Sequence, residues 1–445
     1  MIRKLIGHVL KKGRTKKPKK GAELIALSEH GIYPDAFSRS ALSVVSKLQE
    51  QGFEAYIVGG AVRDALLGIE PKDFDIATNA TPEQVKRIFK RAFIIGRRFK
   101  IVHVMVGMET FEVTTFRGGH EGVKNATGRI VNDNTYGTQA EDAARRDFSI
   151  NAMYYNPATA EISDYHLGMS DIATRRLRVI GDAAKRYEED PIRMLRAIRL
   201  AVKLDLEIDA EARAPIAAQA FRLKNEPPAR LFDEMLKFLH SGHSFDCLNR
   251  LRSEGVAEGI FPLFDAVMTG DTAYLPFVRL VLDNTDVRIK RDQPISVPFM
   301  LAALLWQQVD LAWKKRVATG EKNSTALLLA MTDVADAQDK ELSIPRKFIT
   351  TMREIWGLQC RFEQLAGGRA FRLLAQPRFR AAYDFYVLRS EVGQADKALA
   401  KWWEVFQFAP PAIRDEMVLN VKEETQPKKS RRQARKRKKT PAADE

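Results

Sequence analysis

Apolar and polar residues follow two different periods along this chain. Short stretches such as residues 56–58 and 110–116 are continuously apolar or alternate at every second position, which predicts β-strands. They are interleaved with helical patterns up to about residue 155. Beyond residue 182 strand signals almost vanish, and apolar residues recur at helical spacing, as in Ile192, Leu195, Ile198 and Val202. The pattern predicts an α+β region, with a mixed sheet and helices, followed by an all-α region.

The length of 445 residues exceeds the usual size of one hydrophobic core, so several domains are expected. We expect a head over residues 33–180, a helical neck over residues 181–255 and a helical body over residues 256–425. Two basic tails, residues 1–20 and 426–445, are expected to be disordered.

The net charge of +15 is concentrated in these tails. Residues 1–20 hold nine Lys or Arg and no acid, and residues 427–445 hold nine Lys or Arg against two acids, which leaves the rest of the chain nearly neutral. Cationic segments of this kind suit sequence-independent binding to the phosphates of RNA. A role in solubility alone is the alternative.

The cysteine spacing and the lack of long apolar runs bear on the cellular compartment. Cys247 and Cys360 lie far apart and match no metal or redox spacing, so ordinary core thiols are expected. No apolar run is long enough to predict a transmembrane segment, and the first residues are too polar for a signal peptide. These features favour a cytoplasmic protein.

The segment after the strand at residues 56–58 carries the most informative chemistry. Gly59 and Gly60 have no Cβ, so the backbone can approach a phosphate, and the helix predicted next would point its first amides at the same anion. Asp73 and Asp75 follow, and on one strand they would share a face and offer carboxylates to a divalent cation such as Mg²⁺. A Gly-Gly pair alone predicts a turn and Asp-x-Asp alone a solvated loop. Their combination favours metal-assisted nucleotidyl transfer.

A third acid is expected beside this pair. The alternation of residues 110–117 places Glu112 on the face opposite to Phe111 and Val113. We expect Glu112 to join Asp73 and Asp75; an exposed strand carboxylate is the alternative.

Residues 59–78 resemble the head motif of the superfamily of class II tRNA nucleotidyltransferases and bacterial poly(A) polymerases. Four further stretches are similar to this family's ribose- and phosphate-binding motif, head–neck hinge, EDxxR nucleotide-reading motif and supporting helix, in that order: residues 145–153, 164–171, 189–193 and 230–237. The resemblance is detailed from about residue 56 to 239 and thin afterwards.

The resemblance implies a DNA-polymerase-β-like head that adds AMP from ATP to RNA 3′ ends. It implies catalytic roles for Asp73, Asp75 and Glu112, with Mg²⁺ held by Asp73 and Asp75. The nucleotide is expected to contact residues from several motifs: Gly59, Gly60, Arg63, Asp64, Arg146, Asp147, Asn151, Asp190, Arg193 and Arg196. In the family the EDxxR pair, here Asp190 and Arg193, reads the base. From the residues alone, a helix salt bridge worth about 0.2–0.5 kcal/mol is the simpler interpretation.

Three features favour a poly(A) polymerase over the alternative, a CCA-adding or A-adding tRNA nucleotidyltransferase. Residues 94–104 are similar to a stretch typical of bacterial poly(A) polymerases, although residues 96–100 also fit a basic hairpin at a sheet edge. The tails suit diverse RNA ends, and no appended phosphohydrolase module is present. A non-catalytic RNA-binding protein is a further alternative, which the three acids disfavour.

The body contains a basic stretch with interleaved aromatic residues, 369–387. The favoured interpretation is a helix pair with aromatic rings in the core and arginines outside. A surface that contacts RNA is the alternative.

Overall fold

The computed structural model describes residues 21–96, 100–119, 123–124, 130–132, 135–256, 263–264 and 272–425. Both expected tails therefore lie outside the described residues. The chain divides into two compact units, one formed by Met1–Pro227 and Asp246–Val256, the other by Pro228–Phe245 and Ala257–Glu445. The expected boundaries between head, neck and body stay predictions.

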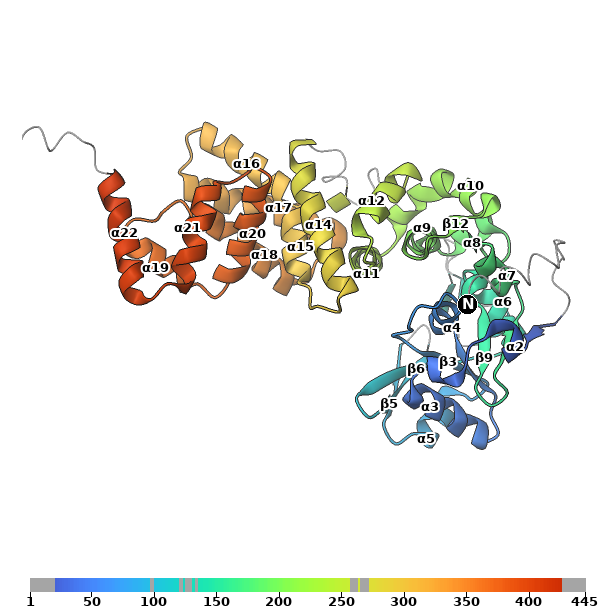
Figure 1. Cartoon of the computed structure of the whole chain (residues 1–445). Helices are drawn as coiled ribbons and strands as arrows, with labels where there is room; N and C mark the ends of the chain where they lie inside the picture. The colour runs from blue at the N-terminus through green and yellow to red at the C-terminus, as the bar shows by residue number, and fades with distance from the viewer. Residues whose placement is uncertain are drawn as a thin grey trace, which may run out of the picture. The chain divides into compact units, whose positions relative to one another are not determined.

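An eight-stranded mixed sheet forms the base of the first unit (Figure 1). The pairing of β3 with β6 is parallel and every other pairing within this sheet is antiparallel. The sheet begins at β1, before the expected start of the head at residue 33. The strand order is β1 (Glu23–Ile25), β10 (Glu161–Asp164), β9 (Met153–Asn156), β2 (Ala55–Val58), β3 (Asp75–Thr78), β6 (Glu109–Thr115), β5 (Ile101–Val106) and β4 (Ala92–Ile95).

The two faces of this sheet differ. On one face Ile57, Ile76 and Val113 are buried in a continuous row, and α3 (Arg39–Glu50) and α5 (Pro82–Ile88) pack against these strands and their neighbours. The opposite face carries a smaller cluster of Val58, Ala77, Phe116, Ala143 and Tyr154. Helix α6 (Gln139–Arg145) supplies Ala143 to this cluster and covers part of the second face. On the same face, Asp75 of β3 and Glu112 of β6 remain exposed.

The remaining elements of the first unit are mostly helical. Strand β12 (Glu207–Ile208), which pairs in parallel with β11 (Arg176–Leu177), lies within the residues expected to form an all-helical neck, so that expectation is wrong for these two residues. The elements are α2 (Leu27–His30), η1 (Pro34–Ala36), α4 (Gly60–Leu66), β7 (Val123–Lys124), β8 (Ile130–Asn132), η2 (Ser149–Asn151), α7 (Gly168–Ala173), β11 (Arg176–Leu177), α8 (Ala183–Glu189), α9 (Ile192–Leu204), β12 (Glu207–Ile208), α10 (Ala210–Gln219) and η3 (Ala220–Asn225).

The second unit is helical throughout its described residues. It contains the helix at residues 230–237 that was expected to support the nucleotide-reading motif, here α11. Its elements are α11 (Pro228–Leu239), η4 (Thr272–Tyr274), α14 (Leu275–Lys290), α15 (Val297–Leu304), α16 (Trp306–Ala318), α17 (Asn323–Leu342), α18 (Arg346–Gln359), α19 (Gly368–Leu374), α20 (Phe379–Glu391), α21 (Lys397–Phe408) and α22 (Pro411–Thr425); α12 (Ser244–Ser253) crosses the division between the units.

Aromatic side chains dominate the core of the second unit. Trp306, Trp356 and Trp403 are fully buried, and the Trp403 indole donates a hydrogen bond to the Phe362 carbonyl. On α20 the aromatic rings are buried while Arg380 is exposed, so the helix-pair interpretation of residues 369–387 is confirmed. Both cysteines are buried, as expected of core thiols. Among the helices of the described ranges, none has the length and apolarity needed to cross a bilayer.

Candidate active site

At the turn between β2 and α4, the backbone of Gly59 lies next to the charged side chains of Asp75 and Arg146. Gly59 has a φ of 78°, a left-handed conformation that costs little only for glycine. A Cβ at this position would lie 3.5 Å from both Asp75 Oδ2 and Arg146 Nη1. The predicted glycine turn therefore lies directly beside one of the predicted acids and one of the predicted phosphate-binding arginines.

Two of the three predicted acids are neighbours across the sheet. Asp75 opens β3 and is in register with Glu112 on β6, so their side chains project from the same face of adjacent strands. Glu112 is exposed between the buried Phe111 and Val113, as its alternation predicts.

The expectation that Asp73 and Asp75 share a strand is wrong. Strand β3 begins at Asp75, and Asp73 precedes it without regular structure. The reason is the pairing with β2, which ends where Val58 meets Asp75 because the chain turns away at Gly59. Asp73 nevertheless lies close enough to act on Asp75 through its charge.

Negative charge is in excess around Asp75. Desolvation raises the pKa of its carboxyl, the charges of Glu112 and Asp73 raise it further, and Arg146 and Arg196 only partly oppose them. In the described part of the chain, no three His, Cys, Asp or Glu side chains form a group ready to hold a metal ion. The arrangement is thus an open pair of carboxylates with a third nearby.

Arg146 is aimed at the glycine turn by a buried partner. Its Nε and Nη2 donate to Asp142 Oδ2 at 3.2 and 3.1 Å, and the Tyr154 hydroxyl donates to the same oxygen at 2.6 Å. The guanidinium also lies 5.3 Å from the centre of the Tyr154 ring. Asp142 stands one turn before Arg146 on α6, so helix spacing signals this pair in the sequence.

Asp147 lies buried in contact with helix α9. Its Oδ2 lies 2.7 Å from Arg196 Nη2, and its Oδ1 accepts hydrogen bonds from the Phe148 amide and the Asn151 side chain. Burial alone would raise the pKa of Asp147, but Arg196 and these hydrogen bonds outweigh it and hold the pKa below its usual range. The charged pair joins the segment after α6 to helix α9.

Arg63 and Asp64 stabilise the glycine turn through hydrogen bonds within the protein. Arg63 is buried; its Nε donates to Asp64 Oδ1 at 2.8 Å and its Nη1 to Asn151 Oδ1 at 2.7 Å. These bonds tie α4 to η2. The predicted nucleotide-binding residues Arg63, Asp64 and Asn151 are therefore brought together, with the Arg63 guanidinium engaged by protein partners.

The EDxxR residues occupy the junction of α8 and α9. Helix α8 ends at Glu189 and α9 begins at Ile192, so Asp190 lies between the two helices, and the expectation that it shares a helix with Arg193 is wrong. Arg193 Nη1 donates to the Arg186 carbonyl at 2.7 Å and to Glu189 Oε2 at 3.2 Å. The orientation of the Arg193 guanidinium is thus set by α8.

Arg186 is a structural residue of the site that sequence reasoning missed. Its buried Nη2 donates to the carbonyls of Arg145 and Arg146 at 2.6 and 2.7 Å, at the end of α6, and its Nη1 pairs with Glu189 at 3.1 Å. Its partners at 145 and 146 are distant in sequence. Glu189 was visible within the EDxxR stretch but was not singled out.

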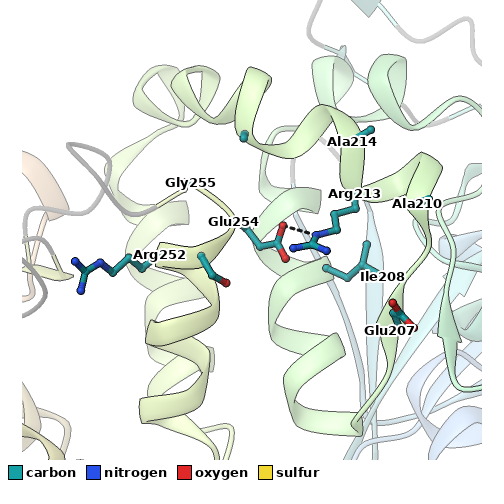
Figure 2. A pocket seen from close by; sticks show the side chains of 10 residues that line it. Glu207, Ile208, Ala210, Arg213, Ala214, Arg252, Glu254 and Gly255 are labelled. Carbon is teal, nitrogen blue, oxygen red and sulfur yellow. Dashed lines mark hydrogen bonds and ion pairs between the residues drawn. The ribbon is translucent and has the colours of Figure 1, made fainter.

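A hollow of about 590 Å³, lined by residues between 207 and 255, is separate from the site of Asp75 and Glu112 (Figure 2). Arg213 and Glu254 point toward one another there, with Nε and Oε2 2.9 Å apart, and Arg252 extends away from them. No predicted site residue lines the hollow; its wall is formed by Glu207, Ile208, Ala210, Arg213, Ala214, Ala217, Arg252, Ser253, Glu254 and Gly255.

Three family models match the chain in order. The model described as "Poly A polymerase head domain" covers residues 55–178. "Probable RNA and SrmB- binding site of polymerase A" covers residues 205–268, which include the hollow of Figure 2. "Polymerase A arginine-rich C-terminus" covers residues 319–439.

Curated relatives extend the match to nearly the whole chain. Poly(A) polymerase I of Escherichia coli O6:H1 is 41% identical over 427 residues, which cover 93% of this chain and 92% of the relative. Poly(A) polymerase I of Haemophilus influenzae is 41% identical over 436 residues, covering 95% and 96%. The CCA-adding enzyme of Streptococcus thermophilus is 38% identical over 210 residues, which cover only 47% of this chain and 51% of that enzyme.

Solved structures share the fold. The Bacillus stearothermophilus CCA-adding enzyme in complex with CTP gives a TM-score of 0.55 at 24% identity, covering 87% of this chain and 82% of that one. The Thermotoga maritima CCA-adding enzyme complexed with tRNA gives 0.54 at 18% identity, covering 91% and 100%. The α+β head followed by helices is thereby confirmed. The similarity to Poly(A) polymerase I along nearly the full length shows that this chain belongs to the family of bacterial poly(A) polymerases, which are nucleotidyltransferases.

Proposed function

We propose that this chain transfers AMP from ATP to RNA 3′ ends without a template. The observation that carries the proposal is the in-register pair of Asp75 and Glu112 beside the Gly59 turn, with Arg146 directed at the same point. The full-length similarity to poly(A) polymerases supports ATP and RNA ends as substrates over CCA addition to tRNA, because the similarity to CCA-adding enzymes covers about half of the chain.

Mg²⁺ is the proposed metal, and Asp73 and Asp75 are the residues that would hold it. Mg²⁺ is commonly bound through one or two carboxylates together with substrate phosphates, and Asp73 lies close enough to Asp75 to act on it through its charge, so these two carboxylates fit it. The excess negative charge around Asp75 supports the same assignment. When bound, the metal would make the RNA 3′-hydroxyl more acidic and neutralise charge on the phosphates.

The proposed reaction is a displacement at the α-phosphorus of ATP. The RNA 3′-oxygen forms a bond to this phosphorus, the bond to pyrophosphate breaks and the hydroxyl proton is released. Glu112, next to Asp75, would act as the third acid, orienting the hydroxyl. Arg146, fixed by Asp142 and Tyr154, would donate to phosphate oxygens near the backbone of Gly59 and Gly60.

The remaining predicted residues would position the sugar and the base. Asp147 and Asn151 would position the ribose, while Arg63 and Asp64 would support the glycine turn through their bonds to each other and to Asn151. Asp190 and Arg193 would select adenine through hydrogen bonds to its edge. The carbonyl and carboxylate of α8 that hold Arg193, and the pairing of Arg196 with Asp147, support this arrangement.

The basic tails and a cytoplasmic location complete the proposal. Residues 1–20 and 427–445 would bind the RNA backbone through their charge, so that diverse 3′ ends could be captured.

The test is pyrophosphate release from ATP with an oligo(A) primer. Asp75→Asn keeps the shape of the side chain but removes its charge, and we expect a loss on the order of a hundred- to a thousand-fold or more. Glu109→Gln is the matched control, since this exposed acid lies on the strand of Glu112 but bonds Ser38 instead of facing the site. An Asp75→Asn variant with near-normal turnover would contradict the proposed role, and a wild-type protein that releases no pyrophosphate would favour the non-catalytic alternative.

A further inference from the structure

An exposed aromatic residue lies in the same row of the sheet as the catalytic acids. Phe93 on β4 is in register with His103 on β5, His103 with Glu112 on β6, and Glu112 with Asp75 on β3. Residues in register on adjacent strands project from the same face. All four side chains therefore lie on the open face of the sheet, in a continuous line.

The exposure of this row has no explanation in the packing of the head. Phe93 is 59% exposed and its neighbour along the strand, Ile95, is 39% exposed, whereas Val102, Val104 and Val113 on the other face are buried. Within the described residues β4 is the last strand of the sheet, so Phe93 and Ile95 lie on an edge strand. Clustered apolar side chains that remain in water are typical of binding surfaces.

His103 connects Phe93 to the acids. Its Nε2 lies 3.5 Å from Glu112 Oε1, and its side chain is 32% exposed. The imidazole is thus held on the row, between an aromatic ring on one side and a proposed catalytic carboxylate on the other. Adjacent strands are about 4.8 Å apart, so Phe93 lies about 10 Å from Glu112 along the row. A nucleoside whose 3′-hydroxyl reaches the acids has its base within that range.

We propose that Phe93 and His103 form a stacking shelf for the 3′-terminal base of the RNA substrate. This inference rests on the proposed adenylyl transfer, because that reaction requires the RNA 3′-hydroxyl at Asp75 and Glu112. Proteins bind single-stranded RNA by stacking its bases on aromatic rings, histidine included. Every base has a π-face, so a shelf of this kind accepts any terminal nucleotide, which suits an enzyme that extends diverse RNA ends.

The position of the row favours RNA over a protein partner. A protein strand could pair with the free edge of β4, but such pairing uses the backbone and does not require the line of rings that leads to the acids. The shelf begins at the edge of the sheet and ends at the proposed site of reaction, so an RNA 3′ end that lies along it would reach the acids.

The test compares primers with and without a terminal base, in the full-length protein with Mg²⁺ and ATP. One oligo(A) primer is intact and the other carries an abasic 3′-terminal nucleotide with its 3′-hydroxyl retained. Phe93→Ala should raise the KM for the intact primer about five- to a hundred-fold, the range expected for one lost base stack. Phe93→Tyr keeps the ring and should behave like the wild type. Tyr33→Ala is the matched control, since this aromatic residue before η1 is also 59% exposed and lies outside the row.

The effects of Phe93→Ala and of the abasic primer on the primer KM should not be additive. With the wild type, the KM for the abasic primer should be higher than that for the intact primer by a similar factor. Phe93→Ala should not raise the KM for the abasic primer further. The KM for ATP and the thermal midpoint should stay unchanged in every variant, because Phe93 is exposed and lies away from the glycine turn.

Three results would overturn the shelf. They are an unchanged primer KM in Phe93→Ala, additive losses for the variant and the abasic primer, and a change in self-association without a change in KM. If the wild type extends the intact primer, these results remove the shelf alone. If the wild type does not extend it, the proposed function itself fails, and the shelf with it.

Discussion

At Asp75, the charged carboxylate that the proposed reaction needs lowers the stability of the folded chain. Its carboxyl is desolvated and faces the charges of Glu112 and Asp73, so its pKa in the folded chain is raised above the ordinary value of 3.8. Ionisation of this group therefore weakens the folded state. The penalty is full above the raised pKa and disappears below the ordinary value. Catalytic sites commonly retain such unfavourable charges for the sake of function.

Asp75→Asn is accordingly expected to raise the free energy of unfolding at pH 7, and the gain over the wild type should vanish as the pH falls below about 4. Urea denaturation at both pH values measures the difference. Glu109→Gln should behave in the opposite way at pH 7, because hydrogen bonds from Ser40 and Ser38 lower the pKa of Glu109. A variant Asp75→Asn that is less stable than the wild type at pH 7 would show that the carboxylate stabilises the fold.

Arg186 and Arg222 provide a second comparison between single residues. Arg186 is buried and donates to two carbonyls and one carboxylate, so Arg186→Met leaves these acceptors without their donor. We expect a loss of about 2–4 kcal/mol in the free energy of unfolding. Arg222 pairs with Glu188 at the surface, 2.7 Å away, and Arg222→Met should cost less than about 1 kcal/mol. Urea titrations of both variants give the answer, and equal losses would contradict the assigned role of Arg186.

The glycine turn shows how one element sets the site. Gly59 has a positive φ, so Gly59→Ala should cost about 1–2 kcal/mol of stability and displace the backbone beside Asp75. Gly60 starts α4, and an added Cβ would make only ordinary van der Waals contact with the Arg63 guanidinium, 3.4 Å away. Gly60→Ala should therefore preserve stability or raise it by up to about 1 kcal/mol. Thermal unfolding and adenylyl transfer of the two variants test this, and equal behaviour would show that the conformation of Gly59 is unimportant.

Sequence patterns predicted helices and strands correctly where residues adjacent in the sequence determine which side chains are buried. The alternation along β6 placed Glu112 on the correct face because burial of Phe111 and Val113 enforces it. The two-residue strand β12, by contrast, exists because it pairs with β11, about thirty residues earlier in the chain.

The errors at the site have the same physical origin. The start of β3 depends on where its partner β2 turns away, so Asp73 was placed on a strand that it only precedes. The role of Arg186 depends on the carbonyls at the end of α6, which no local pattern connects with it. Residues whose position depends on distant partners were the ones that sequence patterns misplaced or missed.

At the level of the whole chain, the similarity itself distinguishes two related activities. The head and neck motifs are shared with CCA-adding enzymes, so the acids, the glycine turn and the EDxxR junction do not separate poly(A) synthesis from CCA addition. Sequence identity to Poly(A) polymerase I extends over 93% of this chain, whereas identity to a CCA-adding enzyme extends over 47% of it. The extent of this identity, and not the shared motifs, is what favours poly(A) synthesis.

The most direct measurement extends two RNAs with the purified full-length protein, Mg²⁺ and each nucleoside triphosphate separately. One RNA is an unstructured oligo(A), and the other is a tRNA that lacks its 3′ CCA. We predict long tails on oligo(A) with ATP and little incorporation of CTP on either RNA. Addition that stops after CCA on the tRNA, with oligo(A) left unextended, would contradict the account and identify the chain as a tRNA nucleotidyltransferase.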